Sequence, residues 1–194
     1  MSLVLTAAPA VEPVTLAEAK AHCRIDESVE DAFLSSLIVT SRLHVEQALG
    51  LALVSQSWAW TLDAWPSDSS VVLPMRPVDS IESITLFAAD GSPAELETWR
   101  YVLDGGATPP RLLPTATRFP DPGARALGIE IRFTAGFGST AAEVPQPIRQ
   151  ALLLLVAHWY ENREPVVSTA RNGEPKRIPD TVSDLLMPYR LVRL

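Results

Sequence analysis

The stretch Pro145-Gln-Pro-Ile-Arg-Gln-Ala-Leu-Leu-Leu-Leu-Val-Ala-His-Trp-Tyr160 decides the fold class, because it predicts a helix that needs partners on more than one side. Pro145 and Pro147 suit the first turn of a helix, where the missing N–H costs nothing. Leu153 and Leu154 widen the apolar face beyond a single stripe, so we expect deep burial. The face itself follows the helical spacing of three and four residues and consists of Ile148, Ala151, Leu152, Leu155, Val156, Trp159 and Tyr160.

Helical partners for this stretch are expected at the front of the chain. Residues 15–25 predict a short helix, in which Thr15 and Glu18 form a capping box. Residues 29–49 predict a longer helix with one apolar face, and Gly50 is placed to end it. From these helices and the stretch above, we expect a shared core that contains Phe33, Leu37, Leu152 and Val156.

The middle of the chain changes from a helical period to an alternating one. Trp58, Trp60 and Leu62 share one face of residues 55–62, as in a half-buried strand. A proline-rich loop is expected at 109–122. Further short strands are predicted at 71–73, 80–87, 99–103 and 127–133. Short strands broken by turn residues indicate an antiparallel sheet or a small sandwich, and not a repeated strand–helix–strand fold.

Together these patterns predict an α+β protein, with a helical bundle from both chain ends and an inserted antiparallel β lobe. Residues 181–187 are expected to add one or two helical turns near the end. The predicted parts are a bundle of 1–50 with 144–164, a β insert of 51–143 and a C-terminal tail of 165–194.

Composition narrows the classes of function. The 194 residues are 47% hydrophobic and 20% charged, as in a soluble globular protein, and the formal net charge is −7. That charge disfavours general nucleic-acid binding, which needs a basic surface. Cys23 is the single cysteine, so no intrachain disulfide is possible. The apolar start lacks the basic residues of a signal peptide, and no apolar run reaches the ~20 residues of a membrane span, so we expect a location in the cytoplasm or a particle assembled there.

The residues that could carry chemistry are scattered, and each has a simpler structural interpretation. His22, His44 and His158 have no second ligand at helical spacing, so packed or surface histidines are favoured over metal ligands. The acidic group at 26–31 is explained by a helix start, where carboxylates face the positive end of the helix dipole. No G-x-S-x-G motif is present to anchor a hydrolase triad. We therefore predict no catalytic residue, no metal and no cofactor.

Two other motifs are weighed in the same way. Residues 134–140 contain Gly136 and Gly138, but they lack the lysine and the third glycine of a phosphate-binding loop, so a glycine-rich strand exit is favoured. Trp58 and Trp60 could form a platform for a sugar or a base, although alternating tryptophans are more often part of a core.

An ordered set of stretches resembles the head–tail connector, or adaptor, proteins of long-tailed bacteriophages, a family that also occurs in prophages and gene transfer agents. Residues 88–126 depart from the family pattern. The stretches that carry the resemblance are Thr15-Leu-Ala-Glu-Ala-Lys-Ala-His-Cys-Arg-Ile-Asp26 with the helix after it, Leu73-Pro-Met-Arg-Pro-Val-Asp-Ser-Ile81, Phe133-Thr-Ala-Gly-Phe-Gly138, Val144-Pro-Gln-Pro-Ile148, His158-Trp-Tyr-Glu-Asn-Arg-Glu164, Ile178-Pro179 and Leu185-Leu-Met-Pro-Tyr-Arg190.

The resemblance implies a structural role at the head–tail junction of a virion or phage-like particle. Such proteins form a ring, usually twelvefold, below the portal protein. The ring extends the DNA channel and docks a tail-side stopper or terminator protein, and DNA passes without sequence-specific binding. The alternatives are a tail terminator, a baseplate-type binding module that uses Trp58 and Trp60, and a small enzyme without a recognisable motif. Because each copy carries −7, we expect modest self-affinity and a ring that forms mainly on the portal.

The C-terminal tail is the predicted portal-binding element. It combines a polar stretch, which a core would hold weakly, with apolar anchors and basic side chains for an acidic partner. The alternative is that Leu185 and Leu186 simply cap the bundle of this chain. The predicted portal-binding residues are Arg171, Lys176, Arg177, Ile178, Leu185, Leu186, Tyr189, Arg190 and Arg193.

Overall fold

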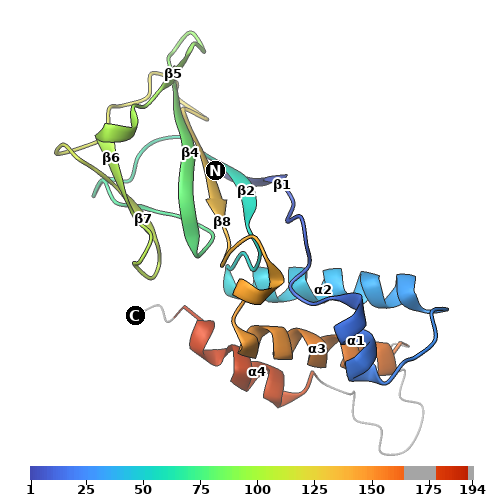
Figure 1. Cartoon of the computed structure of the whole chain (residues 1–194). Helices are drawn as coiled ribbons and strands as arrows, with labels where there is room; N and C mark the ends of the chain where they lie inside the picture. The colour runs from blue at the N-terminus through green and yellow to red at the C-terminus, as the bar shows by residue number, and fades with distance from the viewer. Residues whose placement is uncertain (164–177, 192–194) are drawn as a thin grey trace, which may run out of the picture. The chain divides into compact units, whose positions relative to one another are not determined.

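The computed structural model describes residues 1–163 and 178–191, and it confirms the predicted α+β class (Figure 1). The chain divides into two compact units. The β unit comprises Met1–Ala10 and Gly50–Ser139. The helical unit comprises Val11–Leu49 and the described residues from Thr140 onward.

The β unit contains two antiparallel sheets. The first has the strand order β1-β2-β8-β4-β5, and the second has the order β3-β7-β6. The first sheet is built from β1 (Ser2–Ala7), β2 (Gln56–Leu62), β4 (Val78–Phe87), β5 (Pro93–Glu95) and β8 (Ile129–Ala135). The second is built from β3 (Val71–Val72), β6 (Tyr101–Asp104) and β7 (Arg111–Pro114), and the short 3-10 helix η1 (Thr98–Arg100) leads into β6.

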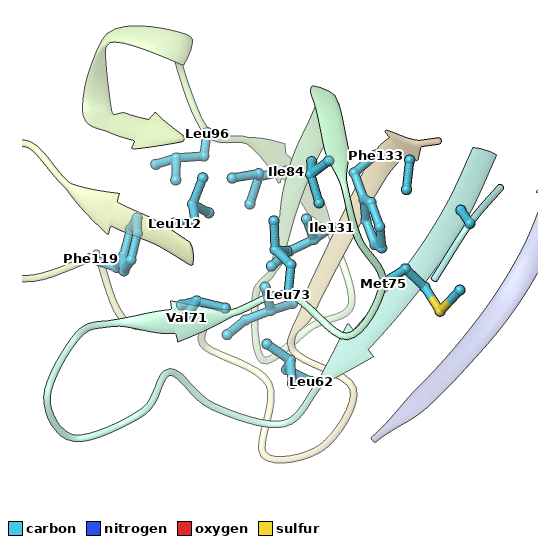
Figure 2. Packing of buried hydrophobic residues seen from close by; sticks show 14 residues of the cluster. Leu62, Val71, Leu73, Met75, Ile84, Leu96, Leu112, Phe119, Ile131 and Phe133 are labelled. Atoms are coloured by element: carbon cyan, nitrogen blue, oxygen red, sulfur yellow. The ribbon is translucent and has the colours of Figure 1, made fainter. Parts of the chain in front are cut away.

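Side chains from both sheets meet in one core, as Figure 2 shows. The central strand β8 alternates strictly, so Ile129, Ile131 and Phe133 are fully buried while the residues between them reach the surface. This is the period-2 pattern of a sheet with one buried face. Trp58 and Trp60 on β2 are half-buried and pack against this same core, so the structure favours the packing interpretation of this pair over an open platform.

The two glycines after β8 are part of the strand exit that we predicted. A Cβ at Gly136 would lie 2.4 Å from the backbone nitrogen of Ser55, so only glycine fits this close approach. The Gly136 N–H donates to the carbonyl of Pro77, and the Ser55 N–H donates to the carbonyl of Gly138. These backbone groups are used by neighbouring strands and do not form a cradle for an anion.

The structure corrects three expectations for the β unit. Residues 1–10, which we assigned to the helical part, belong to the β unit, where β1 pairs with β2. β7 lies inside the predicted proline-rich loop at 109–122. β5 was not expected at all. β1 depends on a distant pairing partner, and β5 and β7 are only three and four residues long, so local sequence patterns carry little of the information that fixes these strands.

The helical unit brings helices from both chain ends together. α2 packs against α3, α1 contacts both, and α4 packs on α3. The predicted capping box of Thr15 and Glu18 is present at the start of α1, and Gly50 follows α2 with a positive φ of 63°. The helices are α1 (Leu16–Cys23), α2 (Asp31–Leu49), α3 (Gln146–Glu161) and α4 (Asp180–Leu186), with 3-10 turns η2 (Ala141–Glu143) and η3 (Met187–Tyr189).

The core of the helical unit differs by one residue from the prediction. Leu152 and Val156 are buried as expected, and Leu37 is half-buried. Phe33 is 36% exposed, so its assignment to the core is wrong. Leu34, its neighbour on α2, is fully buried in its place, because adjacent helical residues point about 100° apart.

Candidate assembly surfaces

The C-terminal helix α4 is partly used by this chain itself. Val182 and Leu186 are buried, and Leu186 is only 7% exposed. The alternative was that Leu185 and Leu186 cap the bundle of this chain. Because α4 packs on α3, this alternative holds for Leu186. The structure therefore does not offer Leu186 as an exposed anchor, whereas Leu185 is half-buried.

The turn after α4 places several of the predicted tail residues near the surface. Met187 is 65% exposed and Arg190 is exposed, while Ile178 and Tyr189 are half-buried. Four of the predicted basic contacts lie outside the described residues, namely Arg171, Lys176, Arg177 and Arg193. The described part of the predicted portal-binding element therefore comprises α4 and the turn after it, and this turn exposes the apolar side chain of Met187 and the cationic side chain of Arg190.

A buried ion-pair cluster fixes α2 to the segment that precedes α1. The Arg42 guanidinium lies 2.8 Å from Glu12 and 2.8 Å from Glu46, and both Arg42 and Glu46 are buried. Arg149 on α3 donates to the carbonyl of Pro13 in the same segment. These charges hold the helical unit together, with Arg42 and Glu46 buried and Glu12 and Arg149 half-buried.

The acidic group near the start of α2 is also engaged in structural pairs. Arg163 lies 2.6 Å from Glu30, and Tyr160 donates a further hydrogen bond to Glu30. The hydrogen bond from Arg163, followed by the one from Tyr160, lowers the pKa of Glu30 to about 2. Asp31 pairs with Lys20 at 2.7 Å. An open hollow of about 490 Å³ lies beside this group, lined by Arg24, Ile25, Asp26, Glu27, Val29, Glu30 and Tyr160.

The residues that could carry chemistry do not converge within the described parts of the chain. Among residues 1–163 and 178–191, no group of three histidine, cysteine or acidic side chains is placed to hold a metal ion. His44 packs edge-on against Trp159, with ring centroids 5.6 Å apart. Burial raises the pKa of the Cys23 thiol, which disfavours the reactive thiolate.

The outer face of α2 is a surface that sequence reasoning missed. Helices at a protein surface normally carry charges on the solvent side. The exposed positions of α2 carry none, because Arg42 and Glu46 point inward and Asp31 is half-buried. We call these positions the α2 face, and they are Ala32, Phe33, Ser35, Ser36, Val39, Thr40, Leu43, His44, Gln47 and Ala48.

The sequence contains a signal for this face, but the signal resembles the pattern of a usual surface helix. Residues 32–41 contain no charged side chain. Arg42 and Glu46, four residues apart, resemble the ion pairs that usually lie on the solvent side of a helix. The inward direction of Arg42 depends on its contact with Glu12, which is far away in the sequence, so the local pattern does not indicate that the pair is buried.

Comparison with known proteins gives one family and a consistent group of structures. The family model described as head completion protein matches residues 12–192. No curated protein matches the chain. No described helix is long and apolar enough to cross a membrane.

Similar solved structures include chains of gene transfer agent particles. A chain of the virion of the native particle is 27% identical with a TM-score of 0.81. A chain of the neck of the empty particle, computed with C6 symmetry, is 29% identical with a TM-score of 0.81. A chain of the neck of the native particle, computed with C12 symmetry, is 26% identical with a TM-score of 0.77. In each case the match covers 100% of this chain and 97% of the other.

Proposed function

Because this chain belongs to the head completion protein family, we propose that it is a structural head–tail connector of a phage-like particle. The observation that carries the proposal is the likeness to neck chains over the full length of both proteins, with a TM-score of 0.81. A match that includes both units and the turn after α4 says more about function than a match to one unit alone would. We place the protein at the head–tail junction, as a component of the particle.

We further propose that the protein works as a homo-oligomeric ring, with twelve copies. The support is the C12 symmetry of the neck that contains a similar chain. A ring needs a side contact in which two different surfaces of one chain meet, and that contact must close by rotation. A charge of −7 per copy suits a channel through which DNA slides, because strong phosphate binding would retain the genome.

Within the ring, the portal protein remains the proposed partner of the C-terminal segment, and a stopper or terminator remains the proposed tail-side partner. The exposed pair of Met187 and Arg190 supports a contact of one apolar and one cationic side chain. Leu186 supports this contact indirectly, by holding α4 on α3. We propose no catalytic step, and the engagement of Arg42 with Glu12 and Glu46 and of Arg163 with Glu30 in ion pairs supports a structural role for these charges.

The role can be tested in cells that produce particles. Removal of the gene should leave DNA-filled heads without tails, and electron microscopy of the lysate would show them. Restoration of joined particles by the wild-type chain is the matched control. Normal particles in the absence of the protein would refute the connector role.

The portal contact needs a sharper test than truncation, since truncation would also uncover α3. Arg190→Glu reverses an exposed charge without touching the buried residues of α4. We expect the variant to fold normally and to bind purified portal more weakly, with a reduced dependence on salt. Asp184→Ala, which alters an exposed position on the preceding helix α4, is the control.

A further inference from the structure

We propose that the α2 face is the side contact between neighbouring copies in the ring. The inference rests on the proposed function, since it identifies the surface that would close the ring. A chain with a net charge of −7 repels its copies. The α2 face has no charged position of its own, so a neighbouring copy can cover it without burying a charge of α2.

Three hydroxyl groups of the α2 face already donate hydrogen bonds within the helix. Ser35 donates to the carbonyl of Asp31, Ser36 donates to that of Phe33, and Thr40 donates to that of Ser36. Each hydroxyl hydrogen is therefore already satisfied within the helix. A partner that covers the face leaves these donors paired, so their burial carries little of the usual penalty for unsatisfied polar groups.

The apolar side chains of the face lie along the helix axis. Val39 and Leu43 are four residues apart on α2, and Leu43 is 50% exposed. Phe33 lies nearer the start of the helix and is covered on one side by the Arg163 guanidinium, 4.8 Å from its ring. Interfaces between proteins are depleted in charge at their centre, and this centre is more apolar than the rest of the surface.

The size of the face favours a repeated contact over an isolated dimer. Nineteen residues make a helix roughly 28 Å long and about 10 Å wide, which gives on the order of 300 Å² per partner. A stable pair of proteins usually buries about 800 Å² per partner. A contact of this size is weak alone, but in a closed ring each copy is held on two sides at once. The occupant that fits is therefore the adjacent copy.

Ring symmetry adds a specific requirement. If the α2 faces of two copies met each other, the contact would be two-fold and would make a dimer. In a ring, the α2 face of one copy must meet a different surface of the next copy. Crosslinks formed from α2 should therefore map outside α2 in the neighbour.

The first experiment places a photo-crosslinking amino acid at position 43 of the full chain, in particles. We expect covalent products at multiples of the mass of this chain, with the second attachment point outside residues 31–49. Products that contain only another protein, or no products, would overturn the proposal. Attachment to α2 itself would also overturn it, because it would reveal a two-fold contact.

The second experiment introduces a charge with Leu43→Glu. Circular dichroism and the melting temperature should be unchanged, while incorporation into particles should fall by about tenfold or more, because the contact would bury an unpaired carboxylate. Val102→Glu, at a position in the β unit that is 54% exposed, is the matched control and should incorporate normally. Normal incorporation of Leu43→Glu would overturn the α2 contact.

A separate result bears on the connector role itself. If the wild-type chain is absent from purified particles, the proposed function fails, whatever the variants do. If the wild type is present and Leu43→Glu is equally abundant, the connector role stands and only the assignment of α2 fails. Should Leu43→Glu not fold, Thr40→Lys introduces a charge on the same face at another exposed position.

Discussion

Arg42 decides which side of α2 faces solvent. It is anchored between Glu12 and Glu46, and this buried cluster fixes the rotation of the helix. Removing one member of a buried ion pair leaves an uncompensated charge, whereas replacing the pair with apolar groups is often neutral. The role of Arg42 is therefore to hold a geometry that the apolar residues around it do not fix alone.

Arg42→Ala should lower the free energy of unfolding by about 3–5 kcal/mol, because two carboxylates lose their buried partner. Urea denaturation would measure the change. The double variant Arg42→Met with Glu46→Leu should recover part of the loss, since Glu46 is no longer stranded. A single variant with wild-type stability would show that the cluster contributes little.

Leu152 and Phe33 provide a matched test of the helical core. Leu152→Ala removes a fully buried side chain and should cost about 2–5 kcal/mol. Leu37→Ala should cost less, because Leu37 is only half-buried. Phe33→Ala should also cost less than Leu152→Ala, since its ring lies at the surface. Equal losses for Leu152 and Phe33 in urea denaturation would contradict this description of the core.

Glu30 should make the stability of the folded protein depend on pH in the acidic range. Its pKa of about 2 in the folded protein lies below the value of about 4.3 for an unpaired glutamate. A depressed pKa stabilises the fold above the unfolded value, and this stabilisation is lost as pH falls from about 4.3 through 2. The difference in melting temperature between the wild type and Glu30→Gln should therefore be largest near neutral pH and shrink below pH 4. Glu27→Gln controls for the loss of one negative charge.

At the scale of the element, β1 shows how an apolar segment acquires its structure from a partner. Leu3 packs against the core of the β unit, and Leu5 pairs with Trp58 on β2. The other neighbour of β2 is β8, so β1 is the element that covers the outer edge of β2. Edge strands left uncovered tend to pair with other chains.

Leu3→Ser should lower stability by about 1–2 kcal/mol, because a half-buried apolar side chain loses its contact with the core. Val4→Ser, at an exposed position on the same strand, should change stability much less. Thermal melting of both variants would test the pair. Deletion of residues 2–7 should lower solubility as well, and light scattering on heating would reveal the aggregates.

The helices were predictable from sequence, whereas the strands β1, β5 and β7 were not, for a physical reason. The capping box at Thr15 and the 3–4 spacing of α3 are local signals that need no knowledge of distant residues. β1 forms because β2, far away in the sequence, provides its hydrogen-bonding partners, and β7 has one neighbour, β3, that is also distant in the sequence. The α2 face was missed for a related reason, since the inward direction of Arg42 depends on Glu12.

At the scale of the whole molecule, charge and ring formation are coupled. We expect the isolated protein to be monomeric or weakly associated at micromolar concentration, because copies with a charge of −7 repel one another. Added salt should increase association by screening this repulsion. Light scattering across a salt series would measure both effects. A stable closed ring without portal would contradict the prediction.

The chain passes between its two units three times, after residues 10, 49 and 139, and this path limits how the protein can be recombined. Residues 50–139 look like a cassette that could be grafted from one relative to another. They are not self-sufficient, because the strand beside β2 comes from the first ten residues. A chimaera that exchanges the β unit must therefore also exchange the N-terminus. In natural recombinants between related particles, residues 1–10 and residues 50–139 should therefore come from the same parent.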